Sequence, residues 1–220
     1  MSQEPGSFIP ALRYRPLTRF YDRVLATTLK EEKLKGLLVV QAALAPGQHV
    51  LDLGCGTGTL SVLLARAQPE ATHLALDADP EALSIARRKA ERDGVEVEFH
   101  QSLAWEAPFA NASLDRVVSS LFFHHLKHDD KLRTLRRVRD WLRPGGELHI
   151  ADWGKAQDPL MRLAFLPVQV LDGFETTTDS VRGRLVAMMR ESGFEEVTET
   201  RRERTLLGTL SLYRAIRPTA

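Results

Sequence analysis

The segment LDLGCGTGTL, residues 51–60, constrains the fold more than any other part of the chain. It runs from an apolar strand into a loop that places glycine at every second position, at Gly54, Gly56 and Gly58. Such a loop, followed by a helix, directs backbone N–H groups and the positive end of the helix at a ligand. The missing Cβ atoms let that ligand approach the backbone closely. We therefore expect a nucleotide-like molecule at the end of this strand.

Strand-like and helical patterns alternate along the chain from this point. Further strands are expected at 72–78, 95–101, 114–123 and 146–153, with helices between them that include 79–94 and 129–146. This alternation is typical of an α/β fold with a parallel sheet covered by helices on both faces. An apolar helical segment at 158–174 and a helix near 179–192 should follow. Two final strands, 194–206 and 208–216, predict a closing antiparallel hairpin.

Composition limits the classes of partner. The 220 residues include 30 basic and 29 acidic side chains, and this near-zero net charge argues against nucleic-acid binding. Cys55 is the only cysteine, which excludes an intramolecular disulfide. The sequence shows neither a secretory signal nor an apolar run long enough to span a bilayer. We therefore expect a cytoplasmic protein without stable membrane insertion.

Spacing after the loop distinguishes a nucleoside from a dinucleotide. The dinucleotide fingerprint has its third glycine where this chain has Thr59. Asp77 ends the second strand roughly 20 residues past the loop, where an acidic side chain accepts hydrogen bonds from both ribose hydroxyls. None of Tyr14, Tyr21 and Tyr213 is followed by lysine four residues later. These features favour a nucleoside ligand and disfavour a nicotinamide-dependent reductase.

Four motifs together point to a family. In this order, LDLGCGTGTL, LALDADPEAL, RVVSSLFFHHL and LRPGGELHIADW resemble the class I S-adenosylmethionine-dependent methyltransferases. The resemblance covers roughly residues 14–217 and is greatest to the small-molecule group that includes ubiquinone/menaquinone-type and sterol-type enzymes. It implies a Rossmann-like sheet of seven strands, five parallel plus the closing antiparallel hairpin, and S-adenosylmethionine as cofactor.

The resemblance also implies where the cofactor lies. The glycine loop would follow its methionine part, with Asp52 near the ammonium group and Asp77 on the ribose. Leu103 stands where relatives often have an acid for the adenine amino group, and Ala78 where a larger apolar residue is common. Backbone at Ala104, or a stacked Trp105, is expected to hold the adenine instead. The predicted cofactor-binding residues are Asp52, Gly54, Cys55, Gly56, Gly58, Asp77, Ala78, Leu103 and Ala104.

The methyl acceptor should lie beyond the carboxyl ends of the strands, against residues 122–126 and 151–153. His124 and His125 are the candidate catalytic residues. Either would line the site, or act as a general base for an acceptor that must lose a proton. Alignment and a dry cavity alone are the alternative, because methyl transfer from a sulfonium is an in-line displacement. We expect no metal ion.

Aromatic and apolar residues are the candidate acceptor contacts. They are Tyr14, Tyr21, Trp153 and Phe165, and they favour a small, mostly apolar or aromatic acceptor. Whether oxygen, carbon, sulfur or nitrogen receives the methyl group is open at this stage. A cofactor-binding regulatory or scaffold protein without turnover is the alternative from another functional class.

We expect one methyltransferase domain over residues 1–220. It would comprise an N-terminal helical cap (1–45), a cofactor-binding core (46–153), a substrate-covering insertion (154–178), and a C-terminal helix and hairpin (179–220). The segment 158–174 is apolar nearly all round, with Arg162, Gln169 and Asp172 as polar exceptions, so it must be buried against something. We favour the acceptor site over the second subunit of a homodimer or a membrane surface. Pro167 should disturb the helix midway.

Overall fold

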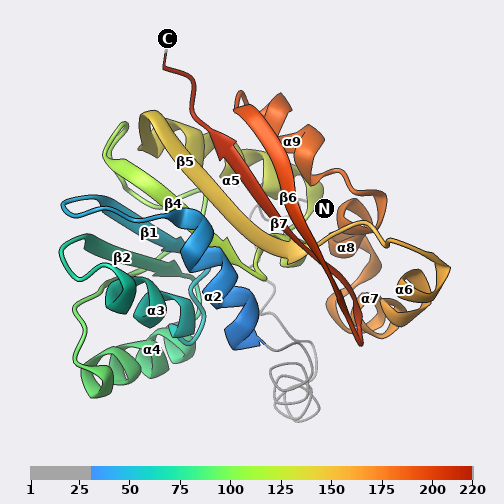
Figure 1. Ribbon diagram of the computed structural model, residues 1–220, viewed down its shortest axis with the longest axis horizontal. Helices are drawn as coiled ribbons and strands as arrows, with labels where there is room; N and C mark the ends of the chain where they lie inside the picture. The colour runs from blue at the N-terminus through green and yellow to red at the C-terminus, as the bar shows by residue number, and fades with distance from the viewer. Residues whose placement is uncertain (1–30, 220) are drawn as a thin grey trace, which may run out of the picture.

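The computed structural model describes residues 31–219 of the chain. One seven-stranded sheet lies at its centre, with the strand order β3-β2-β1-β4-β5-β7-β6 (Figure 1). The five parallel strands are β1 (His49–Leu53), β2 (Thr72–Asp77), β3 (Glu98–Gln101), β4 (Leu114–Ser120) and β5 (Leu142–Trp153). β7 (Gly208–Ile216) pairs antiparallel with β5 and with β6 (Glu195–Thr205). The predicted fold, closing hairpin included, is confirmed.

Helices cover both faces of the sheet. Side chains alternate between the two faces along each strand, and apolar residues on both faces are buried under helices. On one face lie α2 (Glu31–Ala42), α3 (Thr59–Ala67) and α4 (Pro80–Asp93). Leu38 of α2 and Leu60 of α3 share a buried cluster there with Val50 and Val118. On the other face, α5 (His128–Trp141) and α9 (Leu185–Glu191) bury apolar residues against Leu51 and its neighbours. The sheet is therefore the middle of three layers.

The helix predicted at 79–94 forms as α4 with the expected end residues. The Asp79 side chain accepts hydrogen bonds from the N–H groups of Glu81 and Ala82, and Pro80 takes the first helical position. Gly94 ends the helix in the left-handed conformation, with a φ of 64°. Because α4 is fixed at both ends, it holds the turn after β2 in place.

The helix predicted at 129–146 is wrong at its C-terminal end. It stops at Trp141, and β5 begins at Leu142 and includes the Pro-Gly-Gly run assigned to the helix end. The cause is tertiary, because Leu142 is fully buried and pairs with Leu114 of β4. The strand predicted at 114–123 also ends early, at Ser120, and is followed by the short 3-10 helix η1 (Phe123–His125).

The connection between β5 and β6 contains more helices than expected. They are α6 (Pro159–Ala164), α7 (Leu166–Asp172), α8 (Phe174–Arg182) and α9. The break between α6 and α7 falls at Phe165, because Pro167 lies in the first turn of α7, where a missing N–H loses no helical hydrogen bond. Gly183, with a φ of 66°, separates α8 from α9, so the single helix predicted near 179–192 is wrong. Within residues 31–219, no helix has the length and apolar character needed to cross a membrane.

Most of the predicted N-terminal cap, residues 1–45, lies outside the described residues. Its described helix, α2, packs on β4 and β5. The side-chain amide of Gln41 donates a hydrogen bond to the carbonyl oxygen of Tyr213 at 3.0 Å. This helix is therefore part of the cover of the sheet.

Candidate functional site

The predicted site residues gather at one edge of the sheet. The carboxyl ends of β1, β2, β4 and β5 share this edge because the four strands are parallel. The glycine loop follows β1, Asp77 ends β2, η1 follows β4, and α6 and α7 follow β5. Segments far apart in sequence therefore meet at this edge.

The three glycines of the loop are required for different reasons. All have positive φ angles, 70° at Gly54, 52° at Gly56 and 75° at Gly58. A Cβ atom at Gly54 would overlap the ring of Phe122, and one at Gly58 would lie 2.7 Å from the Cβ of Ala86. Nothing lies within 4 Å of the Cβ position of Gly56. Packing within the protein explains Gly54 and Gly58, whereas Gly56 leaves space in which a ligand can approach the backbone.

Asp77 ties this loop to β2. Its Oδ2 accepts a hydrogen bond from the N–H of Gly56 at 2.8 Å, and its Oδ1 accepts one from the N–H of Asp79 at 2.9 Å. Burial raises the pKa of the Asp77 carboxyl, and these two hydrogen bonds offset part of the effect. The predicted ribose acid thus lies beside the open position at Gly56, and Ala78 follows it towards α4.

Asp52 is a buried carboxylate with one unpaired oxygen. The hydroxyl of Ser61 donates to its Oδ2 at 2.6 Å, whereas its Oδ1 has no hydrogen-bond partner among the described residues. Burial raises the pKa of Asp52 to about 6. The charge of Lys35 offsets part of the burial effect. Oδ1 still lacks a hydrogen-bond donor among the described residues, so the ammonium group of the predicted cofactor fits this position. Burial also raises the pKa of the neighbouring Cys55 thiol far above its usual range, which leaves that thiol protonated and unreactive.

The predicted adenine position lies at the end of β3. The N–H of Ser102 donates to the carbonyl oxygen of Asp77 at 3.1 Å, which brings Leu103 and Ala104 beside the end of β2. Trp105 packs against the buried cluster under α5, and the guanidinium carbon of Arg133 lies 5.8 Å from its ring centroid. Protein contacts therefore hold Trp105 in place, and adenine binding by the Ala104 backbone remains a prediction.

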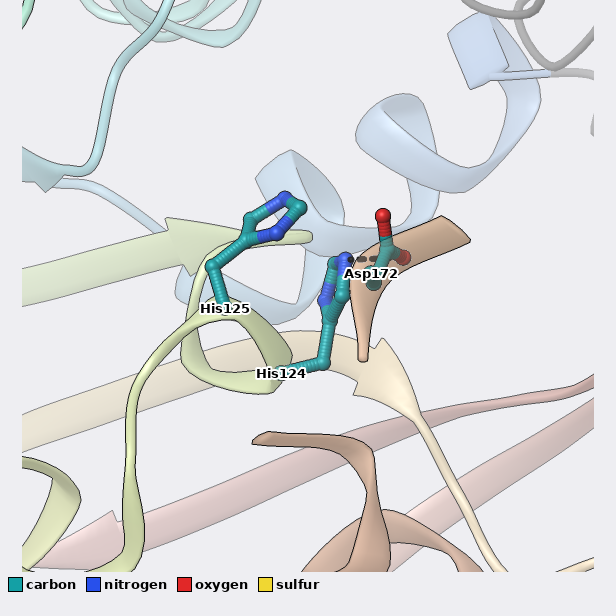
Figure 2. Close-up of side chains that lie close together, drawn as sticks. All are labelled: His124, His125 and Asp172. Carbon is teal, nitrogen blue, oxygen red and sulfur yellow. Dashed lines mark ion pairs between the residues drawn. The ribbon is translucent and has the colours of Figure 1, made fainter. Parts of the chain in front are cut away.

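The two histidines predicted for the acceptor lie on η1. The Nδ1 atom of His124 is 2.7 Å from Oδ1 of Asp152, near the end of β5, and its backbone N–H donates to the second oxygen of that carboxylate. Its Nε2 faces Asp172 of α7, with 3.6 Å between Nε2 and Oδ2. Figure 2 shows His124 between His125 and Asp172, and the two imidazole centroids are 3.9 Å apart.

These contacts give the two imidazoles opposite properties. Burial disfavours the charged form of His124, but the Asp152 charge and hydrogen bond outweigh it and raise the His124 pKa. Burial and the neighbouring His124 lower the pKa of His125 to about 3, so this ring is neutral. Burial raises the pKa of Asp172, and His124 offsets only part of that effect. His124 is therefore an imidazole bracketed by two acidic groups.

Sequence reasoning assigned no role to either acid, although Asp152 lies in the range 151–153 that was expected to face the acceptor. Asp152 lies within the apolar run HIADW, and a lone acid near a strand end is the signal that was available. Asp172 was considered only as a polar exception on an apolar segment. Neither is near His124 in sequence, and only the packing of α7 beside η1 and β5 brings the three side chains together.

The apolar acceptor contacts are described in part. Trp153 and Phe165 are buried with ring centroids 5.1 Å apart, and Trp153 lies edge-on to His124 at 6.4 Å. Tyr14 and Tyr21 lie outside the described residues. Both rings belong to the buried cluster that also contains Leu210 and Leu212, and their contact with the acceptor remains a prediction.

Residues 158–174 bury only one of their faces. Met161, Phe165 and Val168 point inward, and so do the polar Gln169 and Asp172. The outward face exposes large apolar side chains, namely Leu160, Leu163, Leu166, Val170, Leu171 and Phe174. Within the single chain, the inner face of this segment is buried and its outer face is not, so what covers the outer face stays a prediction.

Comparisons with known proteins agree with this architecture. A family model described as a methyltransferase domain matches residues 50–146. The ubiquinone/menaquinone biosynthesis C-methyltransferase UbiE of Vibrio cholerae is 33% identical over 175 residues, which cover 70% of this chain and 66% of that protein. The uncharacterized methyltransferase sll0829 of Synechocystis is 32% identical over 170 residues, 76% of each chain. This chain thus spans about two thirds of the length of the UbiE relative.

A solved structure extends the agreement to the whole fold. The S-adenosylmethionine-dependent methyltransferase SibL superposes with a TM-score of 0.71 at 23% identity, over 97% of this chain and 64% of that one. The comparisons give no support to a nicotinamide-dependent reductase or to a binding protein without turnover. The chain belongs to the class I S-adenosylmethionine-dependent methyltransferases, whose methyl donor is S-adenosylmethionine.

Proposed function

We propose that this protein transfers the methyl group of S-adenosylmethionine to a small, mostly apolar or aromatic acceptor. Two features of β1 and the glycine loop after it carry the proposal. Asp52 has a buried carboxylate oxygen without a hydrogen-bond partner among the described residues, and Gly56 leaves open space beside its backbone. The first suits the ammonium group of the cofactor, and the second suits its close approach to the loop. Asp77, hydrogen-bonded to Gly56, would bind the ribose hydroxyls.

The acceptor would lie between the glycine loop and η1. Trp153 and Phe165, whose rings lie 5.1 Å apart, would supply apolar contacts there, with Tyr14 and Tyr21 as further proposed contacts. His124 and His125 are the polar groups available to the heteroatom of the acceptor. Relatives named for ubiquinone, menaquinone and demethylmenaquinone chemistry support a ring-containing acceptor of low polarity.

The chain's residues would contribute mainly alignment. Methyl transfer is an in-line displacement in which the positive charge of the sulfonium disperses, so no oxyanion hole is needed. Residues at and after the ends of β1 and β2 would bind the cofactor, and residues of η1, β5 and α7 would bind the acceptor. The contact of Phe122 with Gly54 joins these two parts of the site. Burial of the aromatic pair keeps water from the acceptor side.

We propose further that the protein works in the cytoplasm and without nucleic acid, and a homodimer through the outer face of α6 to α8 is the alternative to be tested. The near-zero net charge supports the absence of a nucleic-acid partner. The exposed apolar side chains of α6 to α8 are the surface that such a dimer would cover. Sedimentation at micromolar concentration measures the oligomeric state directly.

Incubation with S-adenosylmethionine and a panel of hydroquinones, phenols and thiols tests the main proposal. We expect one or more panel members to gain a methyl group, with S-adenosylhomocysteine formed in equal amount. Calorimetry should show binding of S-adenosylhomocysteine but not of NADH. Cofactor binding without methylation of any panel member would instead support a binding protein without turnover.

A further inference from the structure

His124, His125 and Asp172 form a compact set of metal-ligating side chains. Each offers one ligand atom, and these three atoms all lie within 4.8 Å of one another. Figure 2 shows that the histidines come from η1 and the carboxylate from α7, and that the three side chains converge. Two imidazoles and one carboxylate with further positions open are a common ligand set for divalent zinc and iron.

Asp172 lacks the partners that a buried carboxylate normally has. Its side chain is only 7% exposed, and His124 is its only ion-pair partner within residues 31–219. The 3.6 Å between Nε2 and Oδ2 is too long for a hydrogen bond. The His125 ring likewise makes no hydrogen bond to any residue in the described part of the chain. The contacts within the protein therefore leave two ligand groups unused.

Asp152 orients His124 for coordination. It holds Nδ1 of that ring at 2.7 Å, which directs Nε2 towards Asp172 and His125. Metal-binding histidines usually donate their second ring nitrogen to a carboxylate in this way. Asp152 is itself fixed, because its oxygens also accept from the backbone N–H groups of His124 and Trp153. The ring is thus held in one orientation before any ion arrives.

We propose that His124, His125 and Asp172 bind one divalent transition-metal ion, with Asp152 as the outer partner of His124. Around a metal with bonds of about 2.1 Å, ligand atoms are about 3.4 Å apart in tetrahedral geometry. The ligand atoms lie within 4.8 Å of one another, so the longest separation must shorten by roughly 1.4 Å, through rotation of the His125 and Asp172 side chains. This departs from our expectation of no metal, because His-His followed by an acid 47 residues later is not a spacing that predicts one.

The ion would act on the acceptor, and in that respect the inference rests on the proposed function. With three protein ligands it has open positions for a hydroxyl or thiol of an aromatic acceptor. Coordination favours loss of the acceptor proton to water. The freed lone pair on oxygen or sulfur then attacks the methyl carbon, and the carbon–sulfur bond electrons return to the cofactor sulfur. The acceptor class is thus narrowed to hydroxyl- or thiol-bearing rings.

Titration of chelator-treated protein with Co²⁺ tests the site without any turnover. We expect saturable binding of one ion per chain, with visible absorption bands of a low-symmetry Co²⁺ centre, and competition by Zn²⁺. His125→Gln and Asp172→Asn should each weaken binding by more than about 100-fold, and Asp152→Asn by about 10- to 100-fold. His100→Gln, on the edge strand β3, is the matched control and should bind as the unaltered protein does.

Two further measurements separate the possible failures. Thermal unfolding of the metal-free variants checks that each variant is folded. S-adenosylhomocysteine binding, measured on the same samples, reports on the proposed function alone. Folded protein that binds S-adenosylhomocysteine but shows no saturable Co²⁺ binding overturns the metal site. Equal losses in His100→Gln and His125→Gln also overturn it, whereas loss of cofactor binding in the unaltered protein overturns the proposed function instead.

Discussion

The ring of Phe122 occupies the space that a side chain at Gly54 would fill. The glycine loop after β1 is therefore packed directly on the segment that leads into η1. His124 and His125 follow Phe122 by two and three residues. The same contact thus sets the cofactor loop and the acceptor side chains relative to each other.

Alanine at Gly54 and alanine at Gly56 should have different effects. Both positions have positive φ, which costs an alanine roughly 1–2 kcal/mol, but only Gly54→Ala also forces a Cβ into Phe122. We expect Gly54→Ala to lower the free energy of unfolding by about 2–5 kcal/mol, and Gly56→Ala by only the backbone cost. The main loss in Gly56→Ala should be affinity for S-adenosylhomocysteine. Urea unfolding and calorimetry measure the two effects, and equal unfolding free energies in the two variants would contradict this account.

Asp52→Asn should stabilise the cofactor-free protein above pH 6. Folding raises the pKa of Asp52 from 3.8 to about 6, so the folded state binds more protons than the unfolded chain between those values. The free energy of unfolding should therefore fall by about 2–3 kcal/mol in total as the pH rises through that window. The variant should exceed the parent in unfolding free energy by that amount at pH 7.5 and match it below pH 4. A difference that stays constant with pH would argue against Asp52 as its source.

The same carboxylate should make cofactor binding depend on pH. Only the charged form of Asp52 attracts the ammonium group, so binding of S-adenosylhomocysteine should weaken as pH falls below about 6. In Asp52→Asn the affinity should be lower and nearly constant between pH 5 and 7.5. Calorimetry in buffers of different ionisation heat should detect proton release on binding near pH 6 in the parent alone. If the affinity depended on pH in the same way in both proteins, Asp52 would not be the group that binds the ammonium.

Asp77→Ala should weaken S-adenosylhomocysteine binding by about 1–3 kcal/mol, the range for losing the partner of a buried polar group. Part of the loss would come from the Gly56 N–H, which donates to Asp77. Asp77→Asn retains an acceptor oxygen for that N–H and is the matched control, with an intermediate loss. NADH should bind to none of the three proteins. Unchanged affinity in Asp77→Ala, or measurable NADH binding, would be incompatible with Asp77 as the ribose acid.

The sequence was informative where local chemistry decides the structure. The glycine spacing and Asp77 come from a strand, a turn and a helix that are contiguous, and capping by Asp79 and Gly94 ends α4 where it was predicted. Errors arose where distant segments decide. β5 begins at Leu142 only because Leu114 is there to pair with it.

The acceptor side of the site depended on such distant contacts. Asp172 was predicted only as a polar interruption of an apolar segment, because one sequence does not show which face of α7 turns towards η1. The fold turns Asp172 and Gln169 inward and leaves Leu166, Val170 and Leu171 outward, the reverse of what an apolar helix suggests. A buried acid can reverse that choice when a histidine such as His124 lies opposite.

Residues 158–174 should exchange amide hydrogens faster than the sheet, and binding should slow them. Few long-range backbone hydrogen bonds hold this segment. Its backbone N–H groups donate within short helices, as Gln169 does to Phe165 and Gly173 to Gln169. Its inner face touches the proposed acceptor position through Phe165 and Asp172. We therefore expect fast exchange in the free protein and slower exchange when S-adenosylhomocysteine and an apolar acceptor analogue are both present.

The outer face of the same segment gives the competing outcome. If Leu160, Leu163 and Val170 are covered by a second subunit, exchange is slow without ligand and rises only on dilution to the monomer. Leu163→Gln and Val170→Gln should then shift the sedimentation coefficient and leave the ligand effect unchanged. The control is β7, whose amides pair with β5 and β6 and should exchange slowly in every state. If ligands slow amide exchange in the dilute monomer, residues 158–174 cover the acceptor site. If exchange depends only on protein concentration, that interpretation is wrong.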